Sequence, residues 1–174
     1  MSHRALLVAG SPTASSRSTS VLTAFAGELE SRGWQLETYS LDSFPAEVLL
    51  RGKFDAEPVK RFTASVKEAS ALVFSTPVYK ATYAGALKTI IDLIEPTALA
   101  DKALLGIATA RLEPHLAEVD LSFQRLYAFF KGSRGLPTLG LLDPQLGVPG
   151  ALALDRAAQQ ALEAALDRLQ GAVA

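Results

Sequence analysis

Apolar positions along the chain follow two patterns, short continuous runs and longer stretches with helical spacing. The continuous runs predict five buried strands at residues 4–9, 34–41, 71–75, 103–108 and 136–142. Helical spacing predicts helices at residues 19–32, 58–69, 84–94, 115–130 and 151–170. The regular alternation of strand and helix is typical of α/β proteins, in which helices connect parallel strands.

This alternation predicts the architecture. Helices that follow each strand of a parallel sheet cover both of its faces, so we expect three layers. Five strands in one such unit favour a flavodoxin-like, doubly wound sheet of order 2-1-3-4-5. We find no internal repeat and no linker, and expect residues 1–174 to form a single domain.

Three segments fit the pattern less regularly. Residues 42–57 contain Pro45 and Gly52 and are expected to be irregular. Pro137 lies inside the fifth predicted strand, where it cannot donate a ladder hydrogen bond. The last helix is expected to present an apolar stripe made of Leu152, Leu154, Leu162, Leu166 and Leu169.

Composition excludes several classes of protein. The chain is 49% hydrophobic with a formal net charge of −1, which argues against nucleic-acid binding and against a markedly acidic electron carrier. It has no cysteine, so disulfides, thiolate metal sites and cysteine nucleophiles are excluded. No apolar run approaches the roughly 18 residues of a membrane span, and we expect a soluble, cytoplasmic protein.

In a doubly wound sheet, ligands bind beyond the carboxyl ends of the strands, where the strand order reverses. For the expected order this point lies between the first and third strands. The loops to inspect are therefore residues 10–18 and 76–83, with residues 109–114 beside them. Unusual residues occur in all three.

The first loop is rich in hydroxyl groups and leads into a helix. A helix N-terminus offers free N–H groups and a favourable dipole to an anion. The candidate phosphate ligands are Ser11, Ser16, Arg17, Ser18 and Thr19. The loop has neither the P-loop pattern nor the glycine pattern of dinucleotide sites. The alternative is a polar loop in which Ser18 caps the helix.

The second loop places a proline and two tyrosines just after a buried strand. Its candidates for contact with a planar ligand are Thr76, Pro77, Val78, Tyr79, Lys80 and Tyr83. Both tyrosines are suited to packing on an aromatic ligand or on a partner subunit. The alternative is that they only cover the end of the sheet.

These two motifs carry a family resemblance. The sequence Gly10-Ser-Pro with Ser16-Arg-Ser, and Thr76-Pro-Val-Tyr-Lys with Tyr83-x-Gly-Ala-Leu-Lys, resembles the NAD(P)H-dependent FMN reductases. The resemblance is strongest to the branch that serves alkanesulfonate monooxygenases, and residues 76–92 are its most specific part. It implies FMN at the strand ends, with its phosphate in the first loop and its isoalloxazine along the second.

The third loop departs from the family pattern. Relatives usually carry Thr-Gly-Gly where this chain has Thr109, Ala110 and Arg111, which occupy the third flavin-binding loop by position. Glycines let a backbone approach a flat ligand closely. Arg111 is therefore open to three interpretations: contact with a flavin oxygen, contact with the pyridine nucleotide, or exposure to solvent.

The resemblance implies that the protein transfers hydride from NAD(P)H to FMN and assembles as a homodimer or homotetramer. For this chemistry we expect neither a catalytic triad nor a metal ion. A flavin-dependent monooxygenase is the partner that it implies for the reduced flavin. Three alternatives stay open: a quinone, azo-dye or chromate reductase with tightly bound FMN, a non-enzymatic FMN electron carrier, and a plain nucleotide- or phosphate-binding module. The sequence does not distinguish NADPH from NADH.

Overall fold

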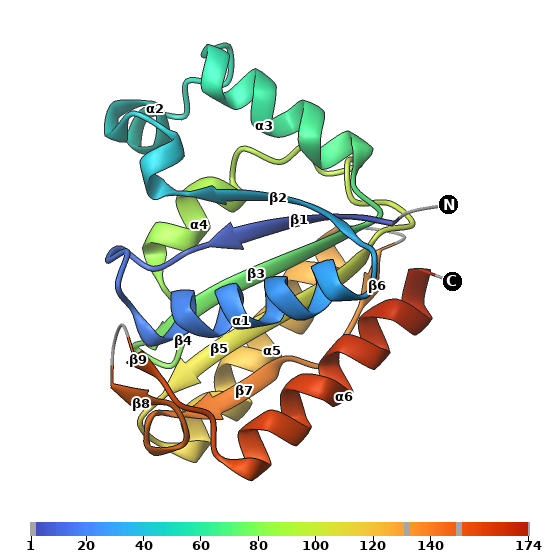
Figure 1. The fold of residues 1–174 in the computed structure, drawn as a ribbon. Coiled ribbons are helices and arrows are strands. Elements are labelled where there is room, and N and C mark those ends of the chain that lie inside the picture. The colour runs from blue at the N-terminus through green and yellow to red at the C-terminus, as the bar shows by residue number, and fades with distance from the viewer. Residues whose placement is uncertain (1–2, 131–132, 149–150, 174) are drawn as a thin grey trace.

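A parallel sheet forms the centre of the computed structural model, which describes residues 3–130, 133–148 and 151–173. Its strands are, in spatial order, β2 (Gln35–Ser40), β1 (Arg4–Ala9), β3 (Ala71–Tyr79), β5 (Ala103–Ala110) and, along the far edge of β5, β6 (Arg134–Gly135) and β7 (Leu139–Leu142). All of these strands pair in parallel. The predicted flavodoxin-like order 2-1-3-4-5 is confirmed (Figure 1).

Helices cover both faces of this sheet. They are α1 (Arg17–Ser31), α2 (Ala46–Arg51), α3 (Glu57–Glu68), α4 (Gly85–Ile91), α5 (Glu113–Phe129) and α6 (Arg156–Val173). In Figure 1, α1 and α6 lie in front of the sheet, with α4 and α5 behind it. Alternate side chains of β1 point to opposite faces, so Leu6 and Val8 join the core beneath α3, α4 and α5, while Ala5 and Leu7 join the core beneath α1 and α6. The expected three layers are present.

The fifth predicted strand is interrupted rather than continuous. β6 pairs with the start of β5 and β7 with its end, and residues 136–138 lie between them. Pro137 has no N–H to give to the ladder, which explains the break. The N–H of Thr138 donates instead to the carboxylate of Asp120 on α5, at 2.9 Å. The interruption is thus bridged by a helix side chain.

The segment expected to be irregular contains two short helices. A 3-10 helix, η1 (Leu41–Ser43), is followed by α2, which ends at Gly52 with φ of 56°. Glycine adopts this left-handed conformation at no steric cost. Val48 and Leu49 of α2 are buried, so this part of the prediction was wrong because a short helix gives too few turns to show its period.

The last helix begins later than predicted. Residues 151–152 form β9 (Ala151–Leu152), which pairs in an antiparallel hairpin with β8 (Gly147–Val148) after a second 3-10 helix, η2 (Asp143–Gln145). The carboxylate of Asp155 accepts a hydrogen bond from the N–H of Ala158 at 2.7 Å and caps α6. Leu162, Leu166 and Leu169 are buried as predicted. Leu152 and Leu154 precede the helix and only flank the same core.

Candidate functional site

A cleft of about 520 Å³ opens at the carboxyl ends of β1, β3 and β5. All three predicted loops contribute to it, with Thr13, Ser15, Ser16 and Arg17 from the first, Pro77, Val78 and Tyr79 from the second, Thr109, Ala110 and Arg111 from the third, and Asp143 from η2. The cleft therefore lies at the topological switch point between β1 and β3. We call it the first cleft.

The hydroxyl groups of the first loop are organised around Ser16. Its Oγ accepts a hydrogen bond from the N–H of Thr19 at 3.1 Å and caps α1, so the interpretation of Ser18 as the cap was wrong. The same Oγ shares hydrogen bonds with the hydroxyls of Ser18 at 3.0 Å and Thr19 at 2.8 Å. Ser18 is buried, and its carbonyl accepts a hydrogen bond from Ser75 at 2.6 Å. Of the hydroxyls of Ser16, Ser18 and Thr19, only that of Ser16 belongs to a residue that lines the first cleft. Ser18 instead connects the loop to β3.

Arg17 is held by the segment that follows β7. Its Nε donates to the carbonyl of Gly147 at 3.2 Å, and its Nη1 lies 3.5 Å from Oδ2 of Asp143. Asp143 lies far from Arg17 in the sequence and was not predicted. The N-terminus of α1, the guanidinium and this carboxylate together form a site where an anion would compete with Asp143 for Arg17.

Ser11 and Thr19 face a different hollow. Together with Ser40 and Asp42 they line a space of about 200 Å³ on the β2 side of the first loop. Ser11 Oγ also accepts a hydrogen bond from the N–H of Thr13 at 3.2 Å, which stabilises the turn of the loop. The candidate phosphate ligands are thus divided between the two sides of the loop.

The second segment continues as strand for longer than predicted. β3 extends to Tyr79 and forms a hairpin with β4 (Thr82–Tyr83), so residues 76–83 are not an open loop. The turn consists of Lys80 and Ala81, whose φ angles are 53° and 62°. These angles are those of a type I′ hairpin turn, which requires positive φ at both central residues, and residues other than glycine and asparagine adopt it at an energetic cost. Such strained turns are often associated with functional sites.

Two predicted residues of this segment, Thr76 and Tyr83, do not line the first cleft. The hydroxyl of Thr76 is buried, donates to the carbonyl of Pro77 at 2.8 Å and accepts from the N–H of Ala84 at 2.9 Å. The ring of Tyr83 lies 5.3 Å from that of Phe123, and burial raises the pKa of its phenol. Tyr79, in contrast, is 49% exposed and lines the first cleft.

The third segment is also partly strand. Thr109 and Ala110 complete β5, and Arg111 stands in the turn before α5, which begins at Glu113. Val78, Tyr79 and Arg111 line the first cleft and also a second cleft of about 820 Å³. The second cleft is otherwise lined by Lys80, Ala81, Leu112 and His115.

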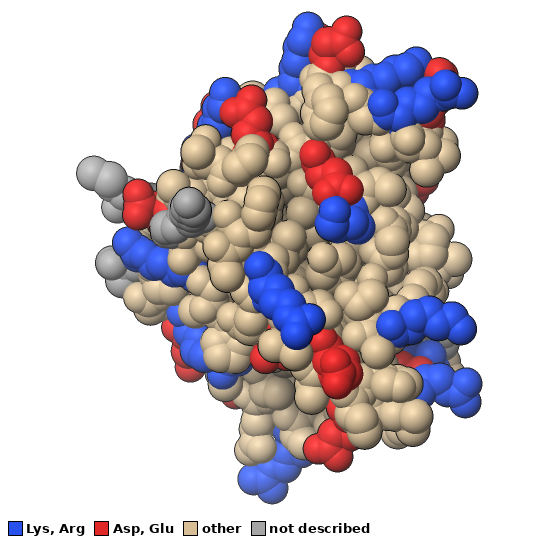
Figure 2. Space-filling view, turned by 180° about the vertical axis from the view of Figure 1, so that it is seen from behind, with Lys and Arg blue, Asp and Glu red and all other residues tan. Residues whose placement is uncertain are grey.

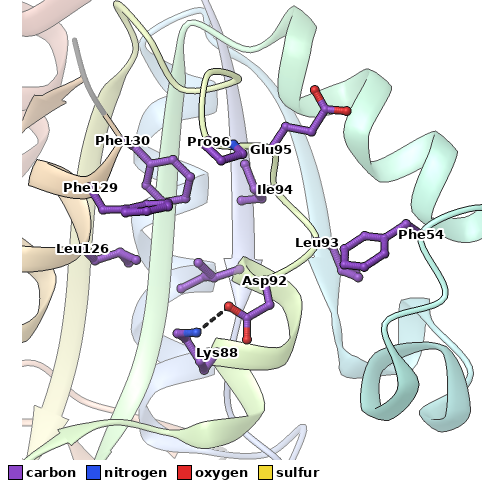
Figure 3. A pocket seen from close by; sticks show the side chains of 11 residues that line it. Phe54, Lys88, Asp92, Leu93, Ile94, Glu95, Pro96, Leu126, Phe129 and Phe130 are labelled. Atoms are coloured by element: carbon purple, nitrogen blue, oxygen red, sulfur yellow. Dashed lines mark hydrogen bonds and ion pairs between the residues drawn. The ribbon is translucent and has the colours of Figure 1, made fainter.

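An apolar hollow of about 520 Å³ lies between α4 and α5, apart from both clefts. In Figure 3, Leu126, Phe129 and Phe130 stand on one side of it, with Leu93, Ile94 and Phe54 on the other. Lys88 and Asp92 form an ion pair at its edge. Figure 2, seen from behind relative to Figure 1, shows a largely uncharged surface with scattered charged side chains.

Among residues 3–130, 133–148 and 151–173, no helix is long and apolar enough to cross a membrane. The same ranges contain no cluster of three or more His, Cys, Asp or Glu side chains that could hold a metal ion.

Comparison with known proteins gives consistent results. Residues 3–134 match the family described as NADPH-dependent FMN reductase. An FMN reductase (NADPH) from Pseudomonas putida is 38% identical over 139 residues, which cover 80% of this chain and 71% of the relative. An NADH-dependent FMN reductase, SfnF, from the same species is 26% identical over 132 residues, covering 74% of this chain and 71% of the relative. The solved apo structure of an NADH:FMN oxidoreductase superposes with a TM-score of 0.89 at 22% identity, covering 99% of this chain and 91% of that one.

Proposed function

Because the chain belongs to the NADPH-dependent FMN reductase family, we propose that it transfers hydride from NAD(P)H to FMN. One observation carries this proposal. A helix N-terminus with a hydroxyl and a guanidinium shares a single cleft with an open strand end that carries an exposed tyrosine ring. An anionic tail and a flat ring are the two recognition elements of FMN.

The polar end of the first cleft suits the phosphate. Ser16 and Arg17 would bind it, assisted by the N–H groups of the first turn of α1. Arg17 would exchange its bonds with Asp143 and Gly147 for charge-assisted bonds to phosphate oxygens. This exchange requires only a side-chain movement, because the loop itself is fixed by Ser16 and Ser18.

The other end suits the isoalloxazine. Pro77, Val78 and Tyr79 would lie along one edge of the ring, with Thr109 and Ala110 beside them. Bound there, FMN would supply N5 as the acceptor of the hydride from C4 of the nicotinamide, and water would supply the proton that completes the two-electron reduction. The side chains of this chain bind and orient the two rings, so the reaction requires no acid–base residue from the protein.

The test is oxidation of NADPH and NADH by desalted protein, with and without added FMN, followed through the absorbance of the reduced nicotinamide. Turnover that saturates with added FMN is expected for a reductase that uses FMN as a substrate. Turnover that ignores added FMN but depends on a quinone or azo dye would instead indicate tightly bound FMN with another acceptor. No oxidation under either condition would leave an electron carrier or a plain binding module.

We also propose that the chain forms a homo-oligomer through α4 and α5. Supporting this, Phe54 and Phe129 both line the apolar hollow and are 62% and 61% exposed, so the hollow and its rim form one exposed apolar surface. Phe129→Asp is expected to lower the mass measured by light scattering on a sizing column, while the circular dichroism spectrum stays unchanged. An unaltered mass would place the interface elsewhere or show a monomer.

Finally, we propose that the reduced FMN serves a flavin-dependent monooxygenase in the cytoplasm. A relative named for NADH-dependent FMN reduction supports the role of flavin supplier. A purified two-component monooxygenase should turn over when this protein, NAD(P)H and FMN are added together. Turnover that requires a separate flavin reductase would contradict the proposal.

A further inference from the structure

The second cleft is lined by two cations and an imidazole ring. The cations are Lys80 from the strained β3–β4 turn and Arg111 from the turn before α5, and the ring is His115 from the first turns of α5. The residues that line this cleft include no acid. For the part of the chain that the structure describes, neither a hydrogen bond nor an ion pair is found at the side chains of Lys80, Arg111 or His115.

Both cations are exposed to solvent, so they repel each other only weakly, but no acid among the lining residues offsets their charge. The left-handed conformation of Lys80 keeps its side chain in the turn beside the cleft. The N-terminus of α5, a helix of 17 residues, adds its positive dipole end at the same place. Glu113 in the first turn of α5 opposes this dipole in part but does not line the cleft. The balance favours a bound anion.

The position of this cleft identifies the anion. Val78, Tyr79 and Arg111 line both clefts, so a group in the second cleft lies directly beside a ring held along Pro77–Tyr79. In a reduced pyridine nucleotide whose nicotinamide faces that ring, the next anionic group along the molecule is the diphosphate. The 2′-phosphate of NADPH lies beyond it, on the adenosine ribose.

The phosphate of FMN itself fits this cleft less well. Its expected ligands are the Ser16 hydroxyl, Arg17 and the first turn of α1, which belong to the first cleft. The second cleft has no serine or threonine among its lining residues. The two clefts therefore suit two different phosphate groups.

We infer that the second cleft binds the diphosphate of the reducing nucleotide, with Arg111 as its main charged contact and Lys80 as a second. This inference rests on the proposed FMN reductase function. It gives Arg111, the residue that replaces a family glycine, the role of a nucleotide-binding residue. It also predicts that this contact does not discriminate NADPH from NADH, because both carry the diphosphate.

Arg111→Ala tests the inference with three reductants: NADPH, NADH and the phosphate-free N-benzyl-1,4-dihydronicotinamide. The KM for both nucleotides is expected to rise roughly tenfold or more, as for loss of one charged hydrogen bond. The kcat/KM for the phosphate-free reductant and the Kd for FMN should stay unchanged. Arg168→Ala, which removes the same charge from the exposed face of α6, is the control and should match the wild type in all assays.

A binding measurement complements the kinetics. ADP-ribose carries the diphosphate but neither nicotinamide nor a 2′-phosphate, and calorimetry on the FMN-loaded protein should show it binding more weakly to Arg111→Ala and to Lys80→Met. If Arg111→Ala lowers kcat/KM for the phosphate-free reductant as much as for the nucleotides, the inference is overturned and Arg111 is a contact of the flavin. A rise in KM confined to NADPH would overturn it and indicate that Arg111 binds the 2′-phosphate. Unchanged KM values for both nucleotides would overturn it and indicate that Arg111 contacts only solvent. Wild-type protein that oxidises none of the three reductants would instead overturn the proposed function itself.

Discussion

The two clefts at the strand ends differ in how far the chain satisfies its own polar groups. In the first cleft, Ser16 caps α1 and bonds two neighbouring hydroxyls, and Arg17 is held by Asp143 and Gly147. In the second, the described residues provide no partner for the Lys80 or Arg111 side chains. One cleft is internally bonded, and the other has charges available to a ligand.

This difference has an energetic consequence. A phosphate that enters the first cleft replaces the hydrogen bonds that Arg17 already makes. Its binding free energy is therefore only the difference between the new and the replaced contacts. A diphosphate that enters the second cleft displaces only water from the cations and relieves their repulsion. We therefore expect the first cleft to be shaped before ligand arrives and the second to be ordered by it.

The largest effect is expected where the first cleft meets the core. A Cβ on Gly10 would lie 2.4 Å from Cβ of Leu87 on α4, so Gly10→Ala should overpack this contact. Urea denaturation should show a loss of about 1–3 kcal/mol in the free energy of unfolding. Gly27→Ala on α1 is the control for the added methyl, because nothing lies within 4 Å of it; this helical position should gain up to about 1 kcal/mol. Equal stability of the two variants would show that α4 yields easily and that the first loop is not fixed by packing.

The second effect concerns the positive charge of Arg17 in the first cleft. Arg17→Ala should weaken FMN binding by about 1–3 kcal/mol, a roughly five- to 150-fold rise in Kd, because a charge-assisted bond to phosphate is lost. Fluorescence titration with FMN measures this. Riboflavin, which lacks the phosphate, provides the control and should bind both proteins alike. A parallel loss for riboflavin would assign Arg17 to the ring or to the shape of the cleft.

A smaller effect is expected at Tyr79, which lines both clefts. Removing its ring should cost about 1 kcal/mol of stacking, seen as a roughly fivefold rise in the KM for FMN or for NAD(P)H. Tyr79→Phe keeps the ring and should restore the wild-type constants. Wild-type kinetics in Tyr79→Ala would show that the tyrosine only covers the end of the sheet.

The smallest effect concerns the turn that presents Lys80. Ala81 adopts φ of 62°, so Ala81→Gly should relieve strain and raise the free energy of unfolding by up to about 1 kcal/mol. The same change should loosen the turn and raise the KM for NAD(P)H slightly, with FMN affinity unchanged. A fall in stability would show that the hairpin, and not the site, selects this conformation.

Much of the first cleft could be predicted from the sequence. Ser16, Arg17, Pro77, Val78, Tyr79, Thr109, Ala110 and Arg111 were predicted as site residues and line it. Thr76 and Tyr83 were predicted from the same motif but do not line the cleft, because β3 continues past Ser75 and folds back as a hairpin. Thr76 is buried, and Tyr83 is partly buried against the core. A motif shows which residues occur together, whereas the course of the backbone decides which of them face the ligand.

The pattern of apolar residues by itself determined the main strands and helices and their alternation along the chain, because burial imposes a characteristic spacing on each kind of element. That alternation then favoured the order of the strands in the sheet. Short-range chemistry determined the first loop, since a helix N-terminus needs polar groups nearby. Only the tertiary structure decided that Asp143 holds Arg17 and that Lys80, Arg111 and His115 line one cleft. These contacts join segments far apart in the sequence, and their geometry follows from how strands and helices pack, which no local pattern encodes.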